Sequence, residues 1–200
     1  MASERRASVS RETRETKVSV EVDLDGEGRY QVSTGIGLLD HLLEQLARHG
    51  LFDITIEASG DVERDPHHLV EDVGLTLGRA LDQALGERRG IFRFGHAIVP
   101  LDEALALVAV DLSGRGYAAV EADFRREIVG GLPTEMLKHF MVAFANEGRL
   151  NVQVRLLAGD NDHHKAEAIF KALARALADA TRLDPRLGED VPSTKGTLGD

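Results

Sequence analysis

The first half of the chain alternates between short stretches with strand periodicity and longer stretches with helical periodicity. Apolar residues occupy every second position from Val18 to Leu24 and again from Phe52 to Ile56, which predicts two half-buried strands. Asp25-Gly26 marks a turn from the first of these into a further strand. Leucines from Leu38 to Leu46 recur at helical spacing, which predicts an amphipathic helix with Gly50 as its C′ residue.

A second helix is predicted where Asp65 and Pro66 combine an N-cap residue with a first-turn proline. Helical periodicity continues from there to about Leu85, so the first half has the order strand-strand-helix-strand-helix. The periodicity stops after Asp184. The Pro- and Gly-broken residues 184–200 are therefore expected to form a loop or an extended arm.

The second half of the chain repeats the order of the first. HLLEQLARHG from His41 corresponds to HFMVAFANEG from His139, 98 positions later. HHLVE from His67 corresponds to HHKAE from His163, 96 positions later, and VDLDGEG corresponds to VDLSGRG, 88 positions later. Three matches in the same order favour an internal duplication over chance similarity between helix-forming segments.

The duplication predicts one domain, residues 1–200, with an α/β (α+β) fold of two tandem pseudo-symmetric repeats. The repeats are expected at about 12–92 and 93–183, followed by a C-terminal arm at 184–200. With 42% hydrophobic residues, the chain can bury a core. It contains no run of about 18 apolar residues and no signal peptide, so we expect a cytoplasmic protein.

Composition narrows the chemistry further. The chain has no cysteine, which excludes disulfides, thiolate metal sites and a cysteine nucleophile. The formal net charge of -10 argues against binding to nucleic acid, because an acidic surface repels a phosphate backbone. A small anionic substrate is still allowed, because a few local arginines and lysines can override the global field.

Four of the eight histidines form two adjacent pairs, His67-His68 and His163-His164, each at a predicted helix start. Each pair is followed by a glutamate, Glu71 or Glu167, one helical turn after the first histidine, so this histidine and the glutamate can chelate one cation. Adjacent residues on a helix diverge by about 100° and should not bind the same ion. A lone pair could be solvated surface, but its duplication favours two sites for Mn, Fe, Co, Ni or Zn.

Exchanging each residue for its equivalent in the other repeat should convert one metal site into the other. This requirement suggests two sites, each with three histidines and one glutamate. Site A is expected to contain His41, His67, Glu71 and His164. Site B is expected to contain His139, His163, Glu167 and His68. Each site leaves two octahedral positions for water or substrate. His49 shares a helical stripe with Gln45 and is expected either to support the metal site or to be a surface histidine.

At this point the chain resembles the imidazoleglycerol-phosphate dehydratase family. The resemblance covers nearly the whole chain after about residue 10, in RETRET, LLDHLLEQLARHG, GDVERDPHHLVED, LGERRGIFRFG, PLDEALALVAVDLSGR, DNDHHKAEAIFKALARAL and VPSTKG. It implies a ribosomal S5 domain 2-like fold with helices packed between sheets. It also implies two manganese ions per subunit and a homo-oligomeric shell of twenty-four subunits with active sites at subunit interfaces.

The resemblance also implies roles for individual residues. Phosphate-binding positions of the family fall on Gln45, Arg93, Arg115, Lys171, Ser193 and Lys195. In an extended arm the last two of these side chains would face the same way. A glutamate that acts near the reacting carbons falls on Glu15, with Glu167 and His49 as further catalytic candidates. The chain departs from the family at Gly116, where proline is frequent.

The implied reaction is the dehydration of imidazole glycerol phosphate to imidazole acetol phosphate, in histidine biosynthesis. Two metals on the imidazole nitrogens would favour the imidazolate, which can expel the adjacent hydroxyl and make the neighbouring C–H acidic. Two alternatives stay open: a two-metal phosphohydrolase, which usually has more bridging carboxylates, and a metal-binding protein without turnover. An RNA-binding module is disfavoured by the charge.

Overall fold

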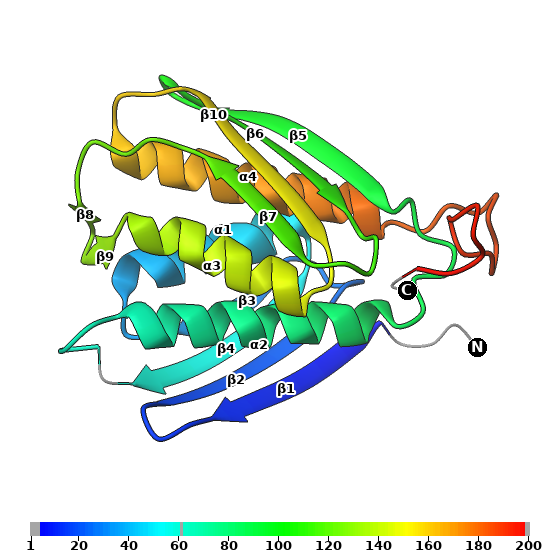
Figure 1. The fold of residues 1–200 in the computed structure, drawn as a ribbon, viewed down its shortest axis with the longest axis horizontal. Helices are drawn as coiled ribbons and strands as arrows, with labels where there is room; N and C mark the ends of the chain where they lie inside the picture. Colours follow the sequence, from blue (N-terminus) through cyan, green and yellow to red (C-terminus); the bar gives the residue numbers. More distant parts are fainter. Residues whose placement is uncertain (1–4, 61, 199–200) are drawn as a thin grey trace.

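The computed structural model of the protein describes residues 5–60 and 62–198, and shows two four-stranded sheets with four helices packed between them (Figure 1). The first sheet has the order β1-β2-β4-β3, made of β1 (Arg6–Glu12), β2 (Thr16–Asp23), β3 (Tyr30–Ser33) and β4 (Asp53–Gly60). The second has the order β5-β6-β10-β7, made of β5 (Phe94–Leu101), β6 (Ala104–Asp111), β7 (Tyr117–Glu121) and β10 (Asn151–Ala158). The strands β1, β2, β3 and β4 correspond in chain order to β5, β6, β7 and β10, so the two sheets have the same strand order. This agreement confirms the predicted α/β fold of two repeats.

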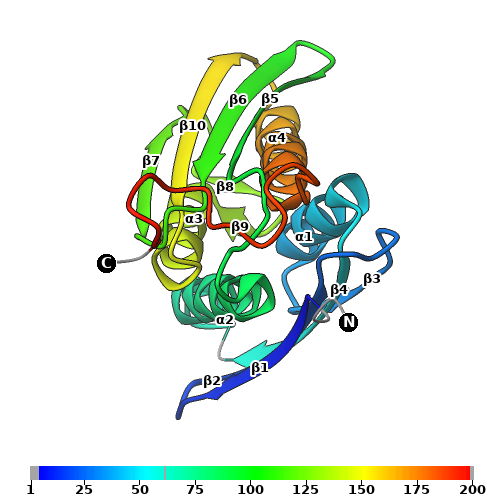
Figure 2. The ribbon, with the colours of Figure 1, turned by 90° about the vertical axis from the view of Figure 1, so that its right-hand side faces the viewer.

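The helices of the two halves are interlocked. They are α1 (Gly37–Gly50), α2 (His67–Leu85), α3 (Glu135–Glu147) and α4 (Asp162–Thr181). Each half contributes its helices to different pairs, because α1 packs against α4 and α2 packs against α3 (Figure 2). Phe140 of α3 and Phe170 of α4 are fully buried, with ring centroids 5.5 Å apart. Both halves therefore share a single core between the sheets.

Two glycines allow α2 and α3 to pack closely. A Cβ atom on Gly78 would lie 2.4 Å from the carbonyl oxygen of Phe144, and one on Gly74 would lie 3.0 Å from that of Phe140. Any side chain at Gly78 would push the helices apart, because real Cβ contacts are longer than this. The close approach holds the first turns of α2 in a fixed position relative to α3.

Most predicted elements are present, with three differences. Each half has one more strand than predicted: β1 was not foreseen because only Val9 of its seven residues is buried. Leu51 (φ 58°), and not Gly50, adopts the left-handed conformation after α1. A Cβ on Gly50 would instead meet the Phe52 ring at 2.5 Å. The strand after Asp25-Gly26 is β3, which pairs in parallel with β4 and not with the strand before the turn.

A short ribbon explains why the spacing between equivalent residues grows from 88 to 98 along the chain. The ribbon consists of β8 (Ile128–Val129) and β9 (Leu132–Pro133), and it lies between β7 and α3. The first half has no counterpart of it between β3 and α1, two elements separated by only a few residues. The insertion therefore lengthens the second repeat without changing its topology.

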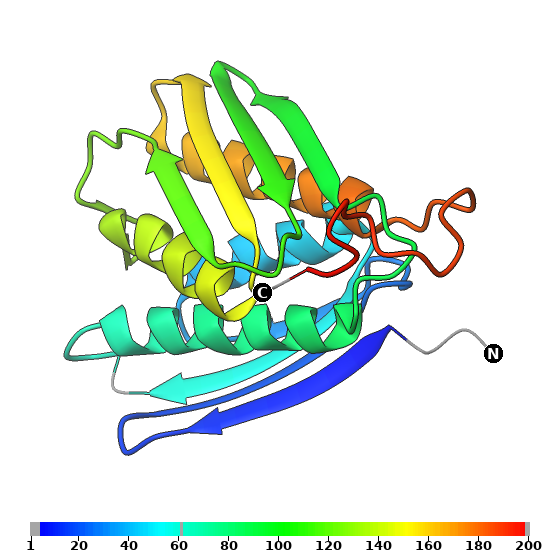
Figure 3. The ribbon, with the colours of Figure 1, turned by 45° about the vertical axis from the view of Figure 1, so that its right-hand side comes forward.

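The C-terminal arm lies at one end of the molecule, away from the starts of α2 and α4 (Figure 3). Its residues 184–198 form no helix or strand, and the backbone N–H of Gly90 donates to the carbonyl of Asp190 at 2.9 Å. The ends of the predicted domain and arm, residues 1–4 and 199–200, lie outside the described residues. Within the described part of the chain, every helix is too short or too polar to cross a membrane.

Candidate metal centre

A first cluster of metal-ligating side chains joins α1 to α4. The Nε2 atom of His41 lies 2.6 Å from Oε1 of Glu167, and Nε2 of His163 lies 3.1 Å from the same oxygen. The two imidazole rings are stacked, with centroids 5.8 Å apart. One ligand atom from each residue lies within 4.8 Å of the others, so the three side chains can hold one ion.

A second cluster joins α2 to α3 in the equivalent way. Nε2 of His139 lies 3.3 Å from Oε1 of Glu71, and the rings of His139 and His67 have centroids 4.3 Å apart. The ligand atoms of these three residues also lie within 4.8 Å of one another. Glu71 is 39% exposed, whereas Glu167 of the first cluster is 11% exposed. The second cluster is therefore the more open of the two.

These clusters overturn the expected division into sites A and B. His41 was assigned to the site of His67 and Glu71, but it lies with His163 and Glu167. In the same way, His139 was assigned to the site of His163 and Glu167, but it lies with His67 and Glu71. The reason is the helix pairing, because α1 packs on α4 of the other half and not on α2. Both divisions obey the symmetry of the repeat, so the sequence pattern could not distinguish them.

Contrary to the predicted sites A and B, neither His68 nor His164 joins a cluster within the described chain. The ring of His68 is turned by 76° from that of His67, and the ring of His164 by 70° from that of His163. Nδ1 of His68 lies 3.0 Å from Oε2 of Glu15. Among the described residues each cluster thus holds two histidines and a glutamate, and the third expected histidine faces outward.

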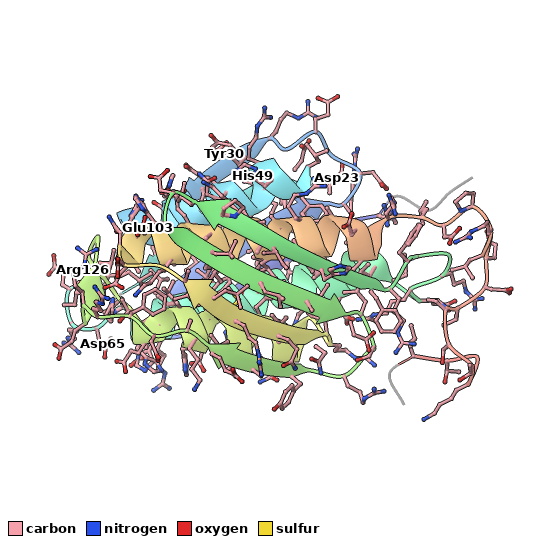
Figure 4. All side chains as sticks on the ribbon, turned by 90° about the horizontal axis from the view of Figure 1, so that it is seen from above. Asp23, Tyr30, His49, Asp65, Glu103 and Arg126 are labelled. Carbon is pink, nitrogen blue, oxygen red and sulfur yellow. The ribbon has the colours of Figure 1, made fainter. Side chains whose placement is uncertain are left out.

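The outward His164 has a carboxylate partner that ligand spacing did not indicate. Glu103 lies in the turn between β5 and β6 (Figure 4). Its Oε2 lies 2.9 Å from Nδ1 of His164. This contact raises the pKa of His164, while the hydrogen bond from His164 and the backbone N–H of Asn161 lower the pKa of Glu103 to about 2. A signal for Glu103 exists in the sequence, since it follows Glu15 by 88 positions.

Charge around the first cluster keeps its carboxylate ionised. Burial raises the pKa of Glu167, but hydrogen bonds from Lys171 and His41 outweigh burial and lower the pKa to about 2. Nζ of Lys171 lies 2.6 Å from Oε2 of Glu167. His49 hydrogen-bonds Gln45 at 2.9 Å, and burial followed by the charge of Lys171 lowers the pKa of His49. The His49 ring is therefore harder to protonate than a free imidazole, and it lies close to the cluster that contains Glu167.

The expected phosphate-binding residues fall into two groups within one chain. One group lines a surface cavity of about 950 Å³ beside the C-terminal arm and consists of Arg93, Arg115, Ser193 and Lys195, together with Arg89. The other group, Gln45 and Lys171, lies on α1 and α4 near the first cluster. The arm and the starts of α2 and α4 are at opposite ends of the molecule (Figure 1). A single chain does not bring the two groups together.

Of the two forms that the sequence allows for the arm, a loop or an extended chain, the structure shows a loop at this cavity. Ser193 and Lys195 lie in a turn, in which the Oγ of Ser193 accepts the backbone N–H of Lys195 at 3.2 Å. Arg93 donates from Nε to Asp111 at 2.7 Å and from Nη1 to the carbonyl of Pro192 at 2.9 Å, which holds the arm in place. A Cβ on Gly116 would lie 2.5 Å from Cα of Asn146, so the turn at this position is tightly packed without proline.

Comparisons with known proteins agree on one family. The sequence profile of imidazoleglycerol-phosphate dehydratase matches residues 34–177. Proteins of that name from Dehalococcoides mccartyi and a Roseiflexus species are 58% and 55% identical to this chain, over 97% and 98% of it and 97% and 99% of their own lengths. Crystal structures of imidazoleglycerol-phosphate dehydratase superpose with TM-scores of 0.81 (Staphylococcus aureus) and 0.82 (Pyrococcus furiosus). Their identities to the chain are 34% and 38%, over 90% and 95% of this chain and 99% and 100% of theirs.

Proposed function

Because the chain belongs to the imidazoleglycerol-phosphate dehydratase family, the hydro-lyases of histidine biosynthesis, we propose that it converts imidazole glycerol phosphate to imidazole acetol phosphate. The observation that carries this proposal is the pair of equivalent His–His–Glu clusters, built once on α1 and α4 and once on α2 and α3. A substrate with an imidazole ring offers two nitrogens, and a pseudo-symmetric protein offers two metal sites for them. The domain of residues 1–200, with its two repeats and its arm, is the catalytic unit in this proposal, and the cytoplasm is its location.

The donor atoms of the clusters fit a divalent transition metal. Imidazole nitrogen with carboxylate, and no thiolate, suits manganese, iron, cobalt, nickel or zinc better than calcium or magnesium. We assign two manganese ions per chain, one to each cluster, on the strength of the family. Two histidines and one glutamate leave coordination positions for a third histidine and for substrate. When bound, the ions supply Lewis acidity that favours the imidazolate form of the substrate.

Two observations support active sites that are shared between subunits. They are the position of His68 and His164 outside the clusters, and the separation of the expected phosphate-binding residues into two groups. His68 and His164 belong to the expected ligand set, but they face away from the clusters of their own chain. The cavity of Arg93 and Lys195 lies at the opposite end from the clusters. In the proposed 24-subunit assembly, neighbouring copies bring His68 and His164 to each other's clusters, and arms to each other's metal sites.

In the proposed reaction the C–O bond of the hydroxyl next to the ring breaks, a proton leaves the neighbouring carbon, and the resulting enol tautomerises to the ketone. Glu15 is suited to move that proton, since its carboxylate is 62% exposed on a hairpin turn beside His68. His49, whose lowered pKa favours the neutral form with a free lone pair, is the second candidate to accept the proton. Glu167 takes part as an ionised metal ligand, which Lys171 stabilises.

The phosphate is the handle that orients the reacting carbons. Guanidinium and ammonium groups of Arg93, Arg115 and Lys195 would form charge-assisted hydrogen bonds to it, together with the Ser193 hydroxyl. Gln45 and Lys171 would contact the phosphate from the subunit that supplies the metal cluster, whereas the arm would come from a neighbouring subunit. Holding both ends of the substrate converts binding energy into correct orientation of the reacting groups.

A direct assay tests the proposal. The purified protein, stripped with a chelator and reloaded with Mn²⁺, is expected to form the ketone from imidazole glycerol phosphate and to lose that activity when stripped again. Inorganic phosphate is measured in the same samples, because its release would indicate the phosphohydrolase alternative. Metal binding without either product would indicate a metal-binding protein and would contradict the proposed function.

A further inference from the structure

The two halves place the same pair of side chains at equivalent positions. The turn between β1 and β2 carries Glu15, whose Oε2 lies 3.0 Å from Nδ1 of His68. The turn between β5 and β6 carries Glu103, whose Oε2 lies 2.9 Å from Nδ1 of His164. Glu15 and Glu103 are 88 positions apart, which is also the spacing between β1–β2 and β5–β6. Glu103 is thus the structural counterpart of Glu15 in the second repeat.

The two glutamates differ in how firmly they are held. Oε1 of Glu103 accepts the backbone N–H groups of Asn161 at 2.7 Å and Asp160 at 3.2 Å, just before α4 begins. Its side chain is 37% exposed, compared with 62% for Glu15. These bonds leave Oε2 of Glu103 aimed at the imidazole of His164. A fixed carboxylate is suited to orient a histidine, whereas a mobile one is suited to exchange protons.

We propose that Glu103 is a positioning residue that fixes the tautomer of His164 for metal binding. A neutral imidazole carries one N–H, and a carboxylate next to Nδ1 requires the hydrogen to be there. The lone pair of Nε2 is then free for an ion held by the cluster of another copy. Carboxylates that orient a ligating histidine in this way are common in metal sites. The inference rests on the proposed function, in which His164 is a metal ligand.

The substitution Glu103→Gln separates this role from a purely structural one. The Oε1 atom of glutamine can still accept the backbone N–H groups of Asp160 and Asn161. The amide NH₂, however, replaces the acceptor opposite Nδ1, so the histidine must carry its hydrogen on Nε2, where it blocks the metal. We expect the Mn²⁺ affinity of the stripped protein, measured by calorimetric titration, to fall by about 10–100-fold. The unfolding temperature of the metal-free protein should remain that of the wild type.

Glu103→Met extends the test, because methionine has a similar length but offers no hydrogen-bond partner to His164 or to the backbone. If Glu103 fixes the tautomer, Met should weaken Mn²⁺ binding less than Gln does, because His164 then still populates the competent tautomer. Met should also lower the unfolding temperature more than Gln, because both backbone bonds are lost. The reverse order of affinities would show that Glu103 acts only through the structure of the turn, and would overturn the proposal.

Asp102→Asn is the matched control. Asp102 is the neighbour of Glu103 and is 75% exposed, with Oδ2 3.9 Å from the same Nδ1 of His164. Its substitution removes an equal charge near the ring without removing a hydrogen bond, so Mn²⁺ affinity should stay at the wild-type value. A loss as large as that of Glu103→Gln would overturn the proposal in favour of a general charge effect.

His164→Gln separates this inference from the proposed function. If it reduces metal binding while Glu103→Gln does not, the ligand assignment stands and the positioning role of Glu103 is wrong. If His164→Gln binds two ions as the wild type does, the ligand assignment falls and the inference with it. In the double variant, Glu103→Gln should have no further effect on affinity, because the residue it positions is already absent.

Discussion

At the scale of single residues, the first cluster combines a carboxylate whose pKa is lowered with imidazole rings that bind metal only when they are neutral. The pKa of Glu167 is about 2 in the metal-free chain, because Lys171 and His41 outweigh burial. Its carboxylate is therefore ionised at neutral and mildly acidic pH. The histidines are different, because an imidazole must be neutral to bind metal and protons therefore compete with the ion for the same nitrogen.

We therefore expect Mn²⁺ affinity to decline as the pH falls through about 6.5, well above the range in which Glu167 is protonated. The loss should begin at a higher pH in the wild type than in Glu103→Gln, because Glu103 raises the pKa of His164 and a raised pKa keeps the ring protonated to higher pH. Titration calorimetry between about pH 5 and 8 measures this. An affinity that is constant over this range would contradict imidazole ligands.

At the scale of elements, the start of α4 depends on a buried ion pair. Asp162 and Lys165 have exposed side-chain fractions of 2% and 4%, and their charged atoms lie 2.8 Å apart. Burial raises the pKa of Asp162, but the hydrogen bond from Lys165 and the backbone N–H groups of Arg126 and Arg125 outweigh it and lower the pKa to about 2. The pair fixes the helix turn that carries His163.

Asp162→Asn should destabilise the metal-free protein by roughly 3–5 kcal/mol, because the buried charge of Lys165 loses its anionic partner and keeps only the hydrogen bond to the carbonyl of Asp123. A lowered pKa means that this stabilisation is complete above about pH 4 and is lost as the pH falls toward about 2. Urea unfolding of both proteins across that range measures the difference. Asp160→Asn is the control, since Asp160 is 74% exposed in its pair with Arg125 and should contribute about 0–1 kcal/mol.

The C-terminal arm is the second element with a testable role. Lys195 lines the cavity with Arg93 and Arg115, so Lys195→Ala should remove a charge-assisted hydrogen bond to the phosphate. A loss of about 1.5–3 kcal/mol corresponds to a roughly ten- to hundredfold rise in KM. Metal content should not change. Arg186→Ala, in the same arm but outside the cavity, is the control, and an unaltered kcat/KM after deletion from Val191 onward would show that the arm has no part in binding.

The sequence predicted helices and strands correctly where buried apolar residues recur at a regular spacing. The helix from His67 to Leu85 has the predicted end, and its start is one residue beyond the proline of the predicted first turn. β1 was missed because an exposed strand with Val9 as its single buried residue has no hydrophobic period. The ligand types followed from the spacing of His67 and Glu71, which helix geometry alone fixes. Their grouping did not follow, because it depends on which helices pack together.

At the scale of the whole molecule, the proposed function implies that an isolated chain has incomplete metal sites. His68 and His164 are expected ligands, but they are not among the residues of either cluster within the described chain. Their side chains are 61% and 28% exposed, so both can reach a neighbouring copy. Under the proposed function, a complete metal site belongs to the assembly and not to the single subunit.

Two defective variants should therefore repair each other. One carries His68→Gln with His164→Gln, and the other carries Glu71→Gln with Glu167→Gln, so neither can build a complete site alone. In mixed assemblies obtained by co-expression, the clusters of the first meet the outward histidines of the second. Dehydratase activity and bound Mn²⁺ should exceed those of either variant alone. A mixture that stays at the level of its parents would contradict sites shared between chains.

The crossed packing of the helices also bears on how such a chain could arise. Each cluster takes a histidine and a glutamate from the second helix of one half, and a histidine from the first helix of the other half. A polypeptide of half this length would have carried three ligands, two histidines and a glutamate, yet it could not have assembled a cluster from its own helices. An ancestor with one repeat must then have worked as a pair of identical chains. Gene duplication and fusion would have made that partnership permanent, leaving Glu15 and Glu103 free to diverge into separate tasks.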